Sequence, residues 1–124
     1  MTKLARVLGA AVVAGAATVA LTGGAAQAVP NTVHLYTGTE ALCEKIGDGG
    51  VANDVFDSYE CKSGVGGYST LVDPSNNLLA NVPVFTDSED VCETVGLNGK
   101  NNGAWSAYGC QLGIVGWTLL VDRW

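Results

Sequence analysis

The sequence predicts an α+β fold, in which two tandem β-α-β-β repeats form one two-layer domain with an antiparallel-rich sheet. Three observations lead to this prediction: an internal duplication, one pair of cysteines inside each copy, and matching strand and helix patterns in the two copies. Residues 34–73 align with residues 83–122 at a constant offset of 49 positions and without a gap. A fixed offset of this kind marks a duplicated structural unit.

Identical residues occur at fourteen of the forty aligned positions, where average composition gives roughly two or three by chance. In the first copy these residues are Thr37, Glu40, Cys43, Glu44, Gly47, Gly50, Asn53, Tyr59, Cys61, Gly64, Gly67, Leu71, Val72 and Asp73.

Residues 1–28 have the pattern of a secretory signal peptide. Lys3 and Arg6 precede an apolar run of mainly Ala, Val, Leu and Gly, and Ala26-Gln27-Ala28 has the small residues of a cleavage site. A membrane anchor is the alternative, but the apolar run is short for one. We therefore expect a secreted, extracellular protein in which residues 29–124 form a single domain. Such a leader is typical of small secreted bacterial proteins.

The charge balance limits the classes of partner. The leader carries two of the six basic residues and none of the twelve acidic ones. Residues 29–124 therefore hold four basic side chains against twelve acidic ones, a formal net charge of −8. Nucleic acid and anionic membrane surfaces repel negative charge, so we expect neither as a partner.

All four cysteines lie after the leader, in a compartment where disulfides persist. Four cysteines allow three pairings. Because each copy holds two cysteines at the same separation, we expect Cys43 to pair with Cys61 and Cys92 with Cys110. A zinc site is the alternative, but no Cys-x-x-Cys motif and no histidine beside a cysteine supports it. We expect no metal and no cofactor.

Each copy begins with β-forming residues, at positions 33–36 and 82–85. The Thr-x-x-Glu spacing of a capping box follows, from Thr37 to Glu40 and from Thr86 to Glu89, and predicts the start of a helix. Apolar residues then recur on one helical face. They are Leu42, Cys43 and Ile46 in the first copy and Val91, Cys92 and Val95 in the second. Gly47 and Gly96 stand where a left-handed helix stop is expected.

Two further strands complete each copy. Residues 58–61 and 107–110 read as extended segments, and after a glycine-containing turn residues 68–73 and 117–122 read as their partners. Residues 74–82 link the copies. Together the strands predict one sheet of about six strands with both helices on one face. An all-β sandwich is the alternative, because frequent glycine blurs the periodicity of the short helices.

Catalytic motifs are scarce. His34 is the single histidine, and its counterpart in the second copy is Pro83. Carboxylate pairs spaced four apart stand at Glu40 with Glu44 and at Glu89 with Glu93. Catalytic carboxyls normally face each other across a cleft. We therefore expect a protein that is not an enzyme, and a small carboxylate-dependent hydrolase is the weakest alternative.

A calcium site in the first loop is a further hypothesis. Asp48, Asn53, Asp54 and Asp57 supply hard oxygen atoms of the kind that calcium prefers. The second copy does not repeat them, and neither copy has the full spacing of an EF-hand loop.

Aromatic residues recur at aligned positions in both copies, and four of them are candidate binding residues: Phe56, Tyr68, Trp105 and Trp117. Rings required in both copies favour core packing. Rings left exposed beside loops suit contact with a protein or stacking on a sugar.

These features favour a small secreted binding protein, stabilised by disulfides, that engages or inhibits an extracellular protein through its loops. The natural contact loops are residues 47–57 and 96–105, each of which holds three glycines outside the expected strands. Binding of a glycan or a cell wall through the aromatic residues is the alternative function.

Overall fold

The computed structural model describes residues 31–124 of the chain. The signal peptide predicted at residues 1–28 lies outside the described residues. From the N-terminus onward, the elements are β2 (Val33–Gly38), α1 (Glu40–Ala52), β3 (Phe56–Gly64), β4 (Gly67–Pro74), β5 (Leu79–Asp87), α2 (Glu89–Asn101), β6 (Ala107–Leu112) and β7 (Trp117–Arg123).

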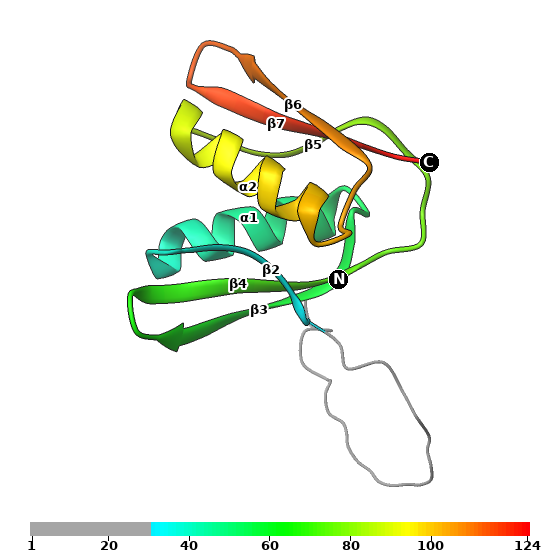
Figure 1. The fold of residues 1–124 in the computed structure, drawn as a ribbon. Coiled ribbons are helices and arrows are strands. Elements are labelled where there is room, and N and C mark those ends of the chain that lie inside the picture. Colours follow the sequence, from blue (N-terminus) through cyan, green and yellow to red (C-terminus); the bar gives the residue numbers. More distant parts are fainter. Residues whose placement is uncertain (1–30) are drawn as a thin grey trace, which may run out of the picture.

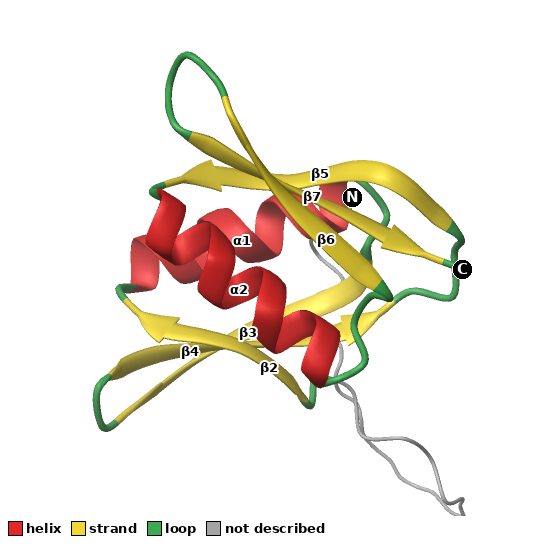
Figure 2. Ribbon diagram, turned by 45° about the horizontal axis from the view of Figure 1, so that its top comes forward, coloured by secondary structure: helices red, strands yellow, loops and turns green. Residues whose placement is uncertain are grey.

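Each repeat forms one antiparallel sheet of three strands. The strand orders are β2-β4-β3 and β5-β7-β6, so the last strand of each repeat lies in the centre of its own sheet. Both helices lie between the two sheets (Figure 1, Figure 2). The α+β class and the two β-α-β-β repeats are therefore confirmed, and the all-β alternative is wrong.

The expected single sheet of about six strands, with both helices on one face, is wrong. The central strands β4 and β7 already use both of their hydrogen-bonding edges within their own repeats. The outer strands β2 and β5 contact a helix of the other repeat, so neither is free to extend the other sheet.

Both helices begin two residues later than the capping-box spacing predicts. Thr39 is the N-cap of α1, and its hydroxyl accepts a hydrogen bond from the Leu42 N–H at 3.1 Å. Ser88 has the same role in α2. Thr37 and Thr86 remain in strands, where each hydroxyl shares a hydrogen bond with a hydroxyl of the central strand.

The helices also run past the expected stops at Gly47 and Gly96. These residues lie inside α1 and α2, as do Gly50 and Gly99, and all four are buried. Each lets an aromatic ring rest directly on the helix backbone, where a Cβ atom would come within 2.2 Å of the ring. The ring partners are Tyr59 for Gly47, Phe56 for Gly50, Tyr108 for Gly96 and Trp105 for Gly99.

Two of these rings meet between the repeats. Phe56 and Trp105, which occupy aligned positions, are stacked with their centroids 6.3 Å apart and their planes at 26°. The indole N–H of Trp105 also donates to the carbonyl oxygen of Gly96 at 2.9 Å, which fixes the ring on α2. The centre of the core is therefore built from matching residues of the two copies.

Contacts between the repeats are reciprocal. At the end of α1, the Asn53 side chain donates to the carbonyl oxygen of Pro83 in β5 at 2.8 Å. At the end of α2, Asn102 donates to the carbonyl oxygen of His34 in β2 at 3.0 Å. Both donors and both acceptors are aligned positions, so the repeats pack as the two halves of a symmetric dimer do, each offering the same surface to the other.

Arg123 ties both repeats to the linker between them. Its guanidinium donates to the carbonyl oxygens of the aligned residues Val55 and Ala104, at 3.1 and 2.7 Å. It also donates to the carbonyl oxygens of Ser75 and Asn77, at 2.8 and 3.0 Å. Burial lowers the pKa of this guanidinium, although an arginine remains protonated in proteins.

The ring-on-glycine packing predicts that Gly99→Ala destabilises the protein by about 1–3 kcal/mol, despite the better helix propensity of alanine. The new methyl group would lie 2.1 Å from the Trp105 ring, which its hydrogen bond holds in place. Gly109→Ala is the matched control, because a Cβ at this strand position has no neighbour within 4 Å. Chemical denaturation of the oxidised protein measures both changes, and equal stability of the two variants would contradict the packing.

Candidate functional site

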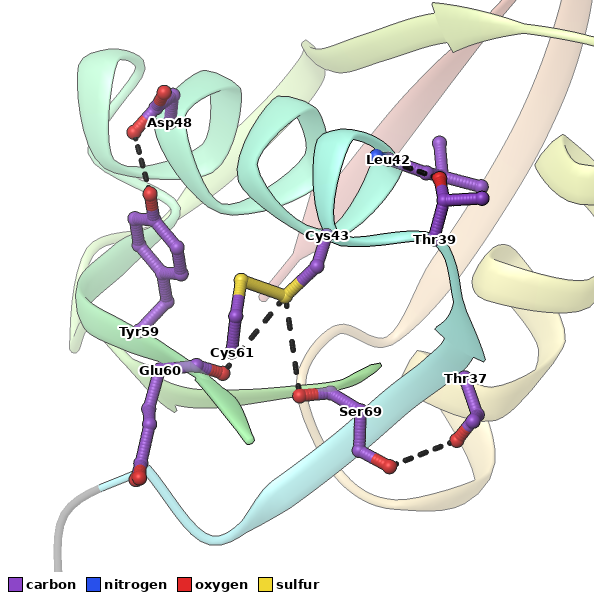
Figure 3. Close-up of a disulfide and its surroundings, with 9 residues drawn as sticks. All are labelled: Thr37, Thr39, Leu42, Cys43, Asp48, Tyr59, Glu60, Cys61 and Ser69. Atoms are coloured by element: carbon purple, nitrogen blue, oxygen red, sulfur yellow. Dashed lines mark hydrogen bonds between the residues drawn. A yellow bond between two sulfur atoms is a disulfide. The ribbon is translucent and has the colours of Figure 1, made fainter. Parts of the chain in front are cut away.

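The two disulfides form as expected, Cys43 with Cys61 and Cys92 with Cys110, with Cα atoms 5.9 and 6.0 Å apart. Each joins a helix to the first strand of the hairpin that follows it. Figure 3 shows the first one between α1 and β3, near the bond from the Tyr59 hydroxyl to Asp48. Each disulfide therefore holds one hairpin, β3–β4 or β6–β7, against its helix.

The second hairpin ends in an exposed aliphatic surface. Leu112 is 64% exposed, Val115 is 85% exposed and Ile114 is fully exposed. These three residues are called the apolar tip below. Aliphatic residues gathered at the end of a turn are uncommon on soluble proteins unless they make a contact.

The first hairpin differs at the aligned positions. Ser63 and Gly66 stand where the second repeat has Leu112 and Val115, and Val65 alone is apolar. Both hairpin turns project from the end of the molecule at which α1 and α2 begin (Figure 1, Figure 2). That end therefore carries one apolar hairpin and one small, mostly polar hairpin.

The turn behind the apolar tip is fixed by backbone contacts. The Gly113 N–H donates to the carbonyl oxygen of Gly116 at 2.7 Å. Gly116 has φ of 144°, and a Cβ there would lie 2.8 Å from the carbonyl oxygen of Asp87 at the end of β5. Only glycine fits this position without strain, so the turn rests closely against β5.

Acidic residues occupy the end of β5 and the start of α2, next to the strand against which the turn rests. Asp87 ends β5, and Glu89 and Asp90 form the exposed first turn of α2. Lys45 of α1 donates to the Asp87 carboxylate at 3.0 Å, and this hydrogen bond lowers the pKa of Asp87. The same ammonium donates to the carbonyl oxygen of Thr86 at 3.2 Å, which joins α1 to the strand that supports the tip.

The four aromatic residues expected to bind a partner do not form one surface. Phe56 and Trp105 are in the core, 2% and 3% exposed, so neither offers a ring to a ligand. Trp117 is half-buried against the core, opposite Leu112 in the β6–β7 pairing. Tyr68 is half-buried near the other hairpin turn.

The expected contact loops are largely helical. Most of residues 47–57 belong to α1, and most of residues 96–105 belong to α2. In the first of these segments Asp48 accepts a bond from Tyr59, and the Asn53 amide bonds to backbone carbonyls. Within residues 31–124, no group of His, Cys, Asp and Glu side chains could hold a metal ion.

The carboxylates considered for catalysis lie on the exposed surfaces of the helices. Glu93 accepts a hydrogen bond from the Tyr108 hydroxyl at 3.1 Å. The pKa of Tyr108 is raised, first by desolvation and then by this bond to a carboxylate. His34 shares a 2.9 Å hydrogen bond with Thr37, whose hydroxyl also contacts Ser69 at 2.9 Å.

Sequence reasoning missed the apolar tip, although the signal was present. At positions 112, 114 and 115 the second copy has Leu, Ile and Val, where the first copy has Ser, Val and Gly. A turn between two strands normally carries polar residues. The contrast between the aligned turns would have identified this segment.

Comparisons with protein-family models, with curated proteins and with solved structures find no match for this chain. In the part of the chain that the structure describes, no helix has the length and apolar character needed to cross a membrane.

One buried hydroxyl lies next to the first disulfide. Thr70 pairs with Cys61 across β3 and β4, is completely buried, and its side-chain oxygen has no hydrogen-bond partner among residues 31–124. The aligned residue in the second repeat is Leu119, which is also fully buried. The position therefore belongs to the core in both copies.

We predict that Thr70→Val stabilises the protein by about 1 kcal/mol, because valine keeps the shape and removes a buried hydroxyl without a partner. Thr37→Val is the comparison, since that hydroxyl contacts two partners and its loss brings no gain. Thermal and denaturant unfolding of the three proteins measures the difference. A marked loss of stability in Thr70→Val would show that its hydroxyl has a partner.

Proposed function

We propose that this chain is a secreted binding protein, stabilised by disulfides, that engages an extracellular protein through the apolar tip. The observation that supports the proposal best is the tip itself: three aliphatic side chains, exposed together on a hairpin that a disulfide and a glycine turn hold in place. The predicted leader and the two disulfides support an extracellular location.

The tip has the shape and rigidity that such contacts use. Full burial of an aliphatic side chain contributes about 1.5–3 kcal/mol, so three together form a substantial anchor. Because the hairpin is already ordered, little conformational entropy is lost when it binds. A projecting apolar hairpin fits a concave site, and a partner enzyme whose cleft accepted it would be inhibited.

The exposed charges near the tip indicate which charge a partner's surface should carry. Glu89 and Asp90 are exposed at the start of α2, the end of the helix that lies toward the hairpin turns (Figure 1), and Asp87 is already paired with Lys45. A partner with an apolar site and a basic rim is therefore complementary to this end of the molecule. Glycan binding, the alternative, has less support because two of the four rings proposed for it are buried.

The proposal predicts that changing the tip abolishes capture of a partner. In the variant Leu112→Ser, Ile114→Ser and Val115→Ser, retention of a stoichiometric protein from the extracellular fraction of the source culture should fall by about tenfold or more. The oxidised protein serves as bait, and mass spectrometry with densitometry measures the retained protein.

Val65→Ser, on the other hairpin, is the matched control and should retain the same protein as the unchanged chain. Thermal unfolding verifies that both variants are folded. Equal retention by the tip variant would remove the tip from the binding surface, and capture of no protein by any bait would count against a protein partner.

A further inference from the structure

Two strand edges remain open after the repeats have packed together. Each sheet has two edge strands, β2 and β3 in the first sheet and β5 and β6 in the second. The edges of β2 and β5 face helices of the opposite repeat, and side chains of α2 and of the C-caps of both helices donate to their carbonyl oxygens. The edges of β3 and β6 pair with no other strand among the described residues.

The backbone groups on the open edge of β6 follow from the turn. Because the Gly113 N–H bonds to the Gly116 carbonyl, the alternation of an antiparallel ladder directs the N–H and C=O groups of Tyr108, Cys110 and Leu112 away from β7. These groups form a row of unpaired donors and acceptors, which is a template for another extended chain.

The two open edges are protected to different degrees. β3 carries Asp57, Glu60 and Lys62, and its pairing with β4 has a register shift near its start. Charges and bulges of this kind keep an edge from pairing with other chains. β6 has no charged residue at all, and Gly109 and Gln111 stand at the positions of Glu60 and Lys62. Of the two open edges, only that of β3 is therefore protected against pairing with another chain.

An acidic side chain of α2 lies near β6. The Glu93 carboxylate of α2 lies beside this strand, since it accepts the hydrogen bond from the Tyr108 hydroxyl. The one basic residue of α2, Lys100, is in the last turn, and β6 itself has none. A segment with basic side chains is therefore complementary to this edge.

We propose that the protein partner contributes an extended, basic segment that adds as a strand to the open edge of β6. The inference rests on the proposed function, because Leu112 both ends β6 and begins the apolar tip. The partner segment then runs along the edge while an apolar site of the partner receives the tip. A second molecule of this protein is a poor occupant, because residues 29–124 of each molecule carry a net charge of −8 and the second molecule would bring its own Glu93 beside the same strand.

The test uses a phage-displayed library of linear twelve-residue random peptides, selected on the oxidised protein. Bound peptides should share lysine or arginine at alternate positions. In titrations, Leu112→Pro should bind a selected peptide about tenfold more weakly than Leu112→Ala, since both lose the leucine and only proline removes the edge N–H. Ser63→Pro, the aligned change on β3, is the matched control and should bind as the unchanged protein does.

Two further readouts address structure and charge. Hydrogen exchange followed by NMR should show new protection of the Tyr108, Cys110 and Leu112 amides when the peptide is bound. Glu93→Gln should weaken binding about threefold or more and reduce its dependence on salt. Thermal unfolding confirms that each variant is folded.

Equal affinity of Leu112→Pro and Leu112→Ala, or a library that yields no peptide specific for the unchanged protein, would overturn the proposed edge site. New dimerisation in place of peptide binding would do the same and would point to a second copy. In either case, loss of capture by the serine variant of the tip would leave the proposed function standing. Retained capture by that variant would remove the proposed function whatever the peptides show.

Discussion

The structure depends on each helix packing against two sheets at once: its own, through a disulfide and two aromatic rings, and the first strand of the other repeat. The close approach of each helix to the first strand of the other repeat is made in a different way in the two copies. At Gly49 a Cβ would lie 1.7 Å from the Val84 carbonyl oxygen. At the aligned position, the Asn98 side chain donates to the Leu35 carbonyl oxygen at 2.8 Å.

The stacked pair of Phe56 and Trp105 fills the centre, and Arg123 donates to carbonyl oxygens of both repeats. Because these contacts are reciprocal, neither repeat buries its helix or protects its first strand without the other.

Comparison of the two copies distinguishes residues that the shared fold requires from residues that it does not. Where the two copies agree, as in the cysteines, the helix glycines and the rings that rest on them, the residues build the common frame. Where they differ at exposed positions, the frame does not explain the residues. Leu112 and Val115 in place of Ser63 and Gly66, and an uncharged β6 edge in place of a charged β3 edge, are differences of this second kind. The two differences adjoin at Leu112, which is why we propose that they form a single binding surface.

Much of this fold could be predicted from the sequence, because the duplication and the cysteine spacing are long-range information. They identified the repeat unit, its element order and both disulfides.

The helix boundaries could not be predicted in the same way. Gly47 and Gly96 resemble helix stops locally, and only the rings of Tyr59 and Tyr108, which pack on them from the next strand, explain glycines within a helix. The burial of Trp105 and Phe56 likewise depends on how the repeats meet. The apolar tip is visible in the sequence as a contrast between the aligned turns, but aliphatic residues lack the chemical groups by which aromatic and titratable sites are recognised.

Native-state hydrogen exchange of the oxidised protein tests the central claim, that the two repeats form one cooperative unit through reciprocal helix packing. The account predicts that the slowest amides of α1 and β4 and those of α2 and β7 exchange with the same free energy of opening, equal to that of global unfolding. It would be contradicted if one repeat exchanged through a lower-energy opening while the other stayed protected, because each repeat would then be stable without the contacts described here.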